Sequence, residues 1–149
     1  MKAVIALGAN LGDPRKQVSI AIDEIRDIAK ISAVSSLHET NPYAVPDNQP
    51  NYINAVLLAE TDHKPFDLTK ALLGVEEKLG RIRSFQNAAR VIDIDLIDFG
   101  GLFMESEHLT LPHPRAHERR FVLEPWFEID PGGILAGRGP IKELLAALP

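Results

Sequence analysis

Two aspartates stand two residues apart in the stretch Arg90-Val91-Ile92-Asp93-Ile94-Asp95-Leu96-Ile97. On a strand such residues point to the same face, so the carboxylates of Asp93 and Asp95 would lie side by side. Aspartate is disfavoured in strands, and two carboxylates about 6 Å apart repel by about 3 kcal/mol at an effective dielectric constant of about 20. A hard cation would turn this repulsion into attraction, and magnesium commonly takes one or two carboxylates together with substrate phosphates. The alternative interpretation is a solvated edge strand that uses charge to resist aggregation.

Arginines gather around this stretch. Six of the nine arginines lie between positions 81 and 120, where there is no lysine. Arg81, Arg83 and Arg90 precede the aspartates, and a second cluster that contains His113 and Arg119 follows them. Guanidinium groups suit bidentate contacts with phosphate, and a polyphosphate is held by a cation together with fixed positive side chains. Each arginine alone is more readily a solvated surface charge, but together with the aspartates they favour phosphate chemistry.

The segment from Thr40 to Asn54 offers groups that suit a flat heterocycle. Tyr52 could stack on such a ring, and the amide of Asn54 presents both a donor and an acceptor that match a heterocycle edge. From these residues alone, a strand-edge tyrosine and a turn asparagine are the better explanation.

The elements that position these residues follow from hydrophobic periodicity. We predict strands at 3–7, 31–38, 52–59 and 90–99, a first helix capped by Asp13, and a second helix capped by Asp67 and stopped at Gly80. An apolar run at 121–127 and a short helix around 141–148 complete the chain. The order strand-helix-strand-strand-helix-strand is the split βαβ arrangement of ferredoxin-like folds. We therefore expect an α+β sandwich in which helices pack mainly on one face of an antiparallel sheet.

Length and composition exclude several classes of protein. The 149 residues predict a single domain, 1–149. A net charge of −5 argues against a nucleic-acid partner, and the lack of cysteine excludes disulfides, thiolate nucleophiles and thiolate zinc sites. No apolar stretch approaches the roughly 18 residues of a membrane span, and the first residues do not form a secretory signal. We expect a cytoplasmic protein without a membrane partner.

The motifs above belong to a longer series of blocks, which includes Leu7-Gly8-Ala9-Asn10-Leu11-Gly12-Asp13, Gln49-Pro50-Asn51-Tyr52-Ile53-Asn54-Ala55, Gly80-Arg81-Ile82-Arg83 and Leu111-Pro112-His113-Pro114-Arg115. In their order and spacing, from about Val4 to Pro131, these blocks resemble the 6-hydroxymethyl-7,8-dihydropterin pyrophosphokinase family. The resemblance implies a ferredoxin-like α+β fold and a magnesium-dependent transferase of folate biosynthesis. Such an enzyme moves the β,γ-pyrophosphoryl group of ATP to the hydroxymethyl oxygen of the pterin and releases AMP. We expect a monomer.

The resemblance also implies the roles of individual residues. Two magnesium ions would bind at Asp93 and Asp95 and bridge the phosphates of ATP. The pterin ring would lie between Tyr52 and Phe121, and the implied pterin contacts are Thr40, Pro42, Tyr43, Tyr52, Asn54 and Phe121. The implied ATP contacts are Glu76, Arg83, His113 and Arg119. The implied catalytic residues are Arg81, Arg90, Asp93 and Asp95.

Two other functions are considered on the residues alone. One is a different magnesium-dependent nucleotide transferase, and the other is a non-enzymatic binding module for a small ligand or single-stranded RNA. Tyr52, Asn54 and Phe121 have no evident role in the first of these. The acidic balance and the lack of an aromatic-rich strand disfavour RNA.

Overall fold

A computed structural model describes residues 1–40, 51–81 and 92–149, with only the backbone described at Arg81. The elements in chain order are β1 (Lys2–Ala9), α1 (Pro14–Arg26), β2 (Lys30–Val34), β3 (His38–Thr40), β4 (Tyr52–Glu60), α2 (Pro65–Arg81), β5 (Asp93–Phe99), β6 (Met104–Glu105), β7 (Thr110–Leu111), the 3₁₀ turn η1 (Ala116–Glu118), α3 (Arg120–Ile129), β8 (Ile134–Leu135), β9 (Gly139–Pro140) and α4 (Ile141–Ala146).

The main sheet of the described residues is antiparallel, with the strand order β2-β4-β1-β5 and with β3 paired to the first residues of β4. β1 lies in the middle of this sheet, and Ala3 to Leu7 are almost fully buried. The strand is covered on both faces, which explains why its sequence is uniformly apolar and does not alternate. The predicted strand at 31–38 is two strands, because the chain leaves the ladder between β2 and β3. The ferredoxin-like order of elements is confirmed.

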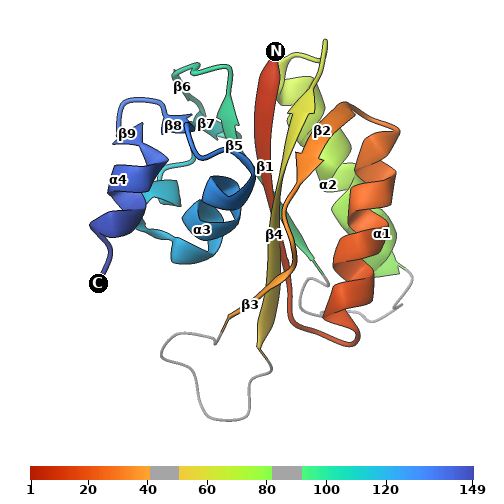
Figure 1. Cartoon of the computed structure of the whole chain (residues 1–149). Helices are drawn as coiled ribbons and strands as arrows, with labels where there is room; N and C mark the ends of the chain where they lie inside the picture. The colour runs from red at the N-terminus through yellow and green to blue at the C-terminus, as the bar shows by residue number, and fades with distance from the viewer. Residues whose placement is uncertain (41–50, 82–91) are drawn as a thin grey trace.

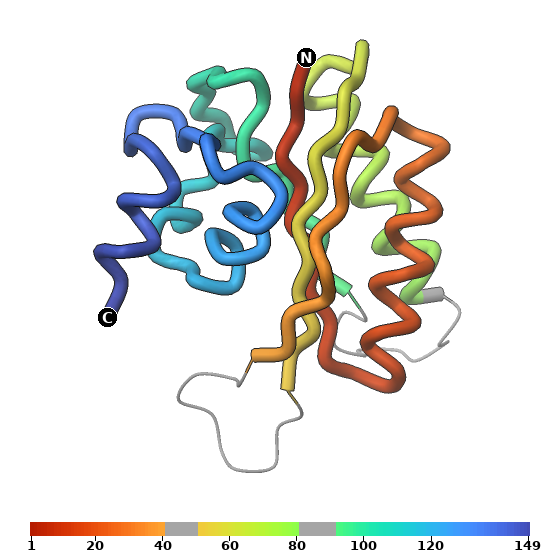
Figure 2. Tube along the Cα trace, in the orientation of Figure 1, coloured from red at the N-terminus to blue at the C-terminus, as the bar shows by residue number. Residues whose placement is uncertain are grey.

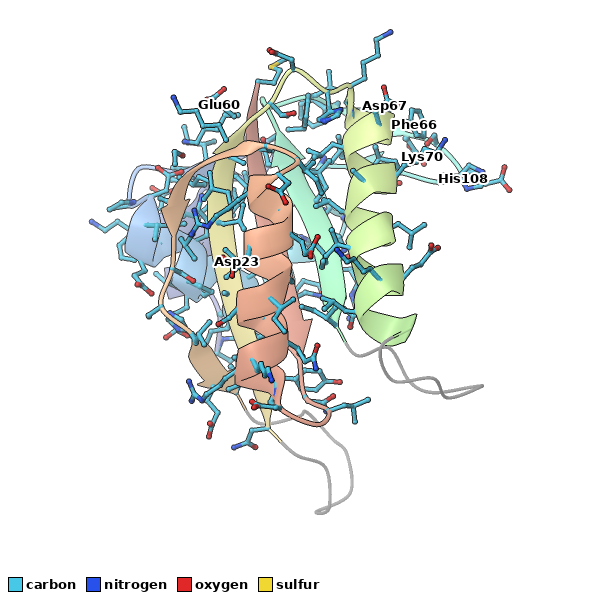
Figure 3. All side chains as sticks on the ribbon, turned by 90° about the vertical axis from the view of Figure 1, so that its right-hand side faces the viewer. Asp23, Glu60, Phe66, Asp67, Lys70 and His108 are labelled. Carbon is cyan, nitrogen blue, oxygen red and sulfur yellow. The ribbon has the colours of Figure 1, made fainter. Side chains whose placement is uncertain are left out.

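One face of the sheet is covered by α1 and α2, which lie side by side over it (Figure 1, Figure 3). Val18, Ile22 and Ile25 of α1 are buried against the strands, as their helical spacing predicts. Leu68, Leu72 and Leu79 of α2 join the same core cluster. Polar side chains such as Asp23 and Lys70 are exposed on the outer sides of these helices.

The opposite face is covered by α3, which Figure 2 shows in blue on the other side of the sheet from α1 and α2. There Val4 and Val56 of the sheet meet Leu123 and Trp126 of α3 in a second buried cluster. The expectation that helices pack mainly on one face therefore describes only the first two helices. The run at 121–127 is apolar because α3 packs against the sheet face opposite α1 and α2.

The helix ends differ in how well the sequence predicts them. The carboxylate of Asp13 accepts a hydrogen bond from the amide of Lys16 at 3.3 Å, so its predicted capping role is confirmed. α2 begins two residues before Asp67, at Pro65, and ends after Gly80, at Arg81. Proline suits the first position of a helix, and Asp67 in the first turn complements the helix dipole. Within the described parts of the chain, no helix is both long and apolar enough to cross a membrane.

The packing of α3 on the second face of the sheet can be tested with one substitution in α3 and one in α2. Leu123 in α3 is fully buried, whereas Leu73 in α2 is 49% exposed. We expect Leu123→Ala to lower the free energy of unfolding by about 2–5 kcal/mol, because it leaves a cavity between α3 and the sheet. The exposed Leu73→Ala should change it by only about 0.5 kcal/mol. Denaturant titration checks both, and equal effects would contradict a buried second layer.

Candidate active site

A single row of residues crosses four strands of the sheet. In the observed register His38 of β3 lies opposite Asn54 of β4, Asn54 opposite Gly8 of β1, and Gly8 opposite Asp93 of β5. Opposite residues in an antiparallel ladder point to the same face, so this row presents its side chains on one side. The next row of that face places Ala6 of β1 opposite Asp95. The candidate site residues Thr40, Asn54 and Asp93 thus come from three separate strands, and His38 marks only the register of β3.

This face is the one that α3 covers at the other end of the strands. Val4 and Ala6 of β1 belong to the cluster under α3, and Gly8 follows them at the same two-residue period. On β4, Val56 lies under α3 while Asn54 and Tyr52 continue the face beyond it. One face of the sheet is therefore apolar at one end and polar at the other.

Asn54 is the most constrained polar group of the row. It is only 4% exposed, and its Nδ2 donates to Oγ1 of Thr40 at 2.7 Å. Thr40 lies opposite Tyr52, so all three residues share the face. A Cβ atom on Gly8 would come within 2.9 Å of Oδ1 of Asn54. Gly8 therefore gives the asparagine its space, a role that the Gly-rich turn in the sequence did not reveal.

Asp93 and Asp95 lie two residues apart on β5 and point to this face, as predicted. Asp93 is exposed and Asp95 is half-buried, while Ile92, Ile94 and Leu96 between and beside them are buried in the α1–α2 core. Within the described residues, no set of three acidic, histidine or cysteine side chains could by itself hold a metal ion. Two carboxylates without further protein ligands suit magnesium, which keeps positions for water and for substrate phosphates.

Glu76 approaches the aspartate strand from the other side of the sheet. Its Oε2 accepts a hydrogen bond from the backbone amide of Ile94 at 2.6 Å, and Ile94 stands between the two aspartates. Among the described strands, β5 lies at the edge of the sheet, so its outward amides face no other described strand. The glutamate of α2 thus fixes the backbone that carries both carboxylates.

His113 is fixed to the same strand by its backbone, because its amide donates to the carbonyl of Ile97 at 2.8 Å. Burial lowers the pKa of the ring, the Asp95 carboxylate raises it, and Arg119 and Arg115 lower it, with a net pKa below the ordinary value. The ring is therefore neutral at pH 7. Its Nδ1 accepts the amide hydrogen of Arg115 at 3.2 Å, so the neutral ring carries its hydrogen on Nε2 and presents a donor there.

Arg119 is the N-cap residue of α3, and Phe121 lies in the first turn of that helix. The guanidinium carbon of Arg119 lies 5.5 Å from the centre of the Phe121 ring, in a cation–π arrangement. Phe121 is half-buried and packs against the second core cluster, so part of its ring is accessible.

The remaining predicted site residues lie outside what the structure describes. Pro42 and Tyr43 fall in the segment 41–50, and Arg83 and Arg90 in the segment 82–91. The side chain of Arg81 is not described either. The described part of the site therefore brings together Asp93, Asp95, His113, Arg119, Asn54, Thr40, Tyr52 and Phe121 around one face, with Glu76 behind it.

Comparison with known proteins identifies relatives along most of the chain. A family model for 7,8-dihydro-6-hydroxymethylpterin-pyrophosphokinase matches residues 4–131. A 2-amino-4-hydroxy-6-hydroxymethyldihydropteridine pyrophosphokinase of Pseudomonas aeruginosa is 34% identical over 99% of this chain and 92% of its own length. The Haemophilus influenzae protein of the same name is 36% identical, over 96% of this chain and 90% of that protein.

Longer proteins contain a similar region. The folic acid synthesis protein of Schizosaccharomyces pombe is 35% identical over 99% of this chain, which spans only 20% of that protein. A crystal structure of the Plasmodium falciparum HPPK-DHPS triple mutant has a similar fold, with a TM-score of 0.76 and 13% identity. The match covers 97% of this chain and 42% of that one.

The charges around His113 predict how its ring titrates. In the metal-free protein we expect an NMR titration to give a pKa below the ordinary histidine value of about 6.5. Asp95→Asn should lower the pKa further, because the carboxylate favours the charged ring, and Arg119→Gln should raise it. Because the folded state binds the proton less readily than the unfolded one, this group costs stability as the pH falls below about 6.5. Shifts of the opposite sign in the two variants would contradict the arrangement.

Proposed function

The chain belongs to the 7,8-dihydro-6-hydroxymethylpterin-pyrophosphokinase family, and we propose that the polar end of its second sheet face carries out that family's reaction. The enzyme transfers the pyrophosphoryl group of ATP to the hydroxymethyl oxygen of 6-hydroxymethyl-7,8-dihydropterin, in folate biosynthesis. The observation that supports this site most is the register that sets Asn54, Gly8 and Asp93 in one row. This register places the Asn54 amide, which suits the edge of a heterocycle, in the same row as the Asp93 carboxylate, which suits a metal–phosphate complex.

The pterin is proposed to bind at the Asn54 end of the row. A buried amide that has already lost its water can read the edge of a heterocycle, and its bond to Thr40 orients it. Tyr52 lies two residues away on the same face, and Phe121 offers a partly accessible ring from α3. These aromatic side chains supply stacking surfaces, and Pro42 and Tyr43 are proposed as further contacts.

ATP is proposed to bind at the Asp93 end, with two magnesium ions held by Asp93 and Asp95. Magnesium held by these carboxylates would neutralise charge on the phosphates. Arg119 adds positive charge beside the metal site, and the Nε2–H of neutral His113 can donate a hydrogen bond to a phosphate oxygen. Arg81 and Arg90 are proposed as catalytic arginines and Arg83 as a nucleotide contact. Glu76, proposed to contact the nucleotide, would do so while it holds the Ile94 amide.

The described residues favour catalysis by positioning and by charge stabilisation. Asn54 and Thr40 fix the pterin, while the aspartates fix the phosphates at a neighbouring place on the same rigid sheet. The hydroxymethyl oxygen is thereby held near the phosphorus that it attacks, which removes much of the entropic cost of a two-substrate reaction. Donors aimed at the transferring group then stabilise the charge that develops on its oxygens.

The proposal extends to the state of the protein. Residues 1–149 are proposed to act as one domain and as a cytoplasmic monomer, with ATP and the pterin as its partners and without a nucleic acid or a membrane. The single-domain part of this proposal is supported by β1, β3, β4 and β5, whose described site residues converge on one sheet face.

A turnover assay with ATP, magnesium and hydroxymethyl-dihydropterin tests the reaction. We expect AMP to form in proportion to the pterin added, without ADP, because the two terminal phosphates leave together. Formation of ADP would indicate an ordinary kinase, and AMP release that ignores the pterin would indicate another transferase. Either result would overturn the proposed function.

Two carboxylates of β5 provide a matched pair of variants in the same assay. Asp95→Asn should reduce turnover about a hundredfold or more, because a metal ligand is lost, with little change in stability. Asp98 is buried, and its two oxygens accept the backbone amides of Gly101 and Ala136. Asp98→Asn should instead cost about 1–3 kcal/mol of stability and keep turnover while the protein stays folded. Near-normal turnover in Asp95→Asn would refute the assigned metal site.

A further inference from the structure

A cluster of three polar residues connects α3 to the start of β3. Oε1 of Glu128 accepts a hydrogen bond from Oγ of Ser36 at 2.8 Å and lies 2.7 Å from Nε2 of His38. Its Oε2 accepts the backbone amide of Ser36 at 2.9 Å. An ionised carboxylate only accepts, so His38 must carry a hydrogen on Nε2 and donate it. We call Ser36, His38 and Glu128 the α3–β3 tether.

Glu128 occupies a position that a helix does not favour for a carboxylate. It lies in the last turn of α3, where the helix dipole opposes negative charge. The hydrogen bonds from His38 and Ser36 nevertheless lower the pKa of Glu128 below its ordinary value. The charge of Glu128 is thus stabilised by His38 of β3 and by Ser36, two residues before that strand, and not by its own helix.

The strand side of the tether is itself fixed to the sheet. Ser35 is buried, its amide donates to the carbonyl of Val56 at 2.9 Å, and its Oγ accepts the amide of Val56 at 3.0 Å. Ser36 and His38 therefore extend from an anchored point on β4. Figure 1 shows β3 continuing from there on the side of the sheet where α3 lies.

Both ends of the tether belong to elements that also carry proposed pterin contacts. Glu128 and Phe121 are seven residues apart on α3, close to two helical turns, so they lie on one stripe of the helix. His38 and Thr40 are two residues apart on β3 and share a face, and Thr40 holds Asn54. The tether therefore joins the side of α3 that carries Phe121 to β3, whose Thr40 orients Asn54.

We propose that the α3–β3 tether is a positioning device that sets the distance between Phe121 and the Asn54–Tyr52 edge, and so determines the affinity for the pterin. This inference rests on the proposed function. The tether residues do not act on the reacting atoms, because they lie on β3, the linker before it and the far end of α3, away from Asp93 and Asp95. Their loss should change pterin binding while leaving the chemical step intact.

The test compares two glutamates of the same helix. Glu124 is exposed and pairs within α3 with Arg120 at 3.7 Å, so Glu124→Ala is the matched control for Glu128→Ala. We expect Glu128→Ala to raise the KM for the pterin about fivefold, the scale of one lost charge-assisted hydrogen bond at a partly exposed site. The KM for ATP and the kcat should stay within about twofold of the wild type, and Glu124→Ala should change none of the three.

Two substitutions of His38 separate positioning from general destabilisation. A glutamine places an amide donor near the position of Nε2, so His38→Gln should keep the wild-type KM for the pterin. His38→Leu removes the donor and should raise that KM as Glu128→Ala does, and the double variant His38→Leu/Glu128→Ala should be little worse than either single variant. A pterin KM that is unchanged in Glu128→Ala, or a loss confined to kcat, would overturn the proposal.

The result can be told apart from a failure of the proposed function. If the wild type forms AMP normally but Glu128→Ala behaves like Glu124→Ala, the tether is refuted and the reaction stands. If the wild type forms no AMP with the pterin, the proposed reaction is overturned. Amide hydrogen exchange then tests separately whether the tether holds β3. Faster exchange at residues 36–40 in Glu128→Ala than in Glu124→Ala would support it, and equal exchange would refute it.

Discussion

The site depends on one geometric rule, that opposite residues of an antiparallel ladder share a face. Because β1 pairs with β4 on one side and β5 on the other, the register at Gly8 decides which groups meet. A slip of one residue on either side would turn Asn54 or the aspartates into the core under α1 and α2. The apolar residues of β1 are buried on both faces and pair with β4 and β5. The same pairing therefore keeps Asn54 on β4 aligned with the aspartates on β5.

The second face of the sheet combines stability and chemistry. Under α3 it is sealed by residues such as Val56 and Leu123, and beyond α3 it becomes polar at Asn54, Asp93 and Asp95. Asp93 and Asp95 lie on the same face of β5, and Glu76 holds the backbone between them from the opposite side. We interpret this as a firmly positioned pair of carboxylates, placed so that a cation and phosphates can bind. The α3–β3 tether would do the same for the aromatic side.

The sequence predicts the order of elements and the placement of Asp93 and Asp95 on one face, because both follow from short periods of apolar residues. Alternation at Ile92 to Leu96 placed the carboxylates on one face, and helical spacing at Val18 to Ile25 placed the first layer. The second layer was not predicted, because an apolar run of seven residues does not say which face of a sheet it covers. Nor could the sequence show that Gly8 makes room for Asn54 or that His38 meets Glu128, since these depend on register and on contacts 90 residues apart. The roles of Pro42, Tyr43, Arg81, Arg83 and Arg90 stay predictions.

We propose that metal and phosphates bind at the Gly8 end of β1 and on no other part of the sheet. Paramagnetic Mn²⁺ in place of magnesium, added with a non-hydrolysable ATP analogue, tests this by broadening nearby amide signals in an NMR spectrum. The account predicts broadening centred on Gly8, Ile94 and Asp95 that disappears in Asp95→Asn. Lys2 and Glu60 pair at the other end of the strands, about 20 Å away at about 3.3 Å per residue, and should stay sharp. Broadening centred on Glu60, or broadening that persists unchanged in Asp95→Asn, would contradict the account.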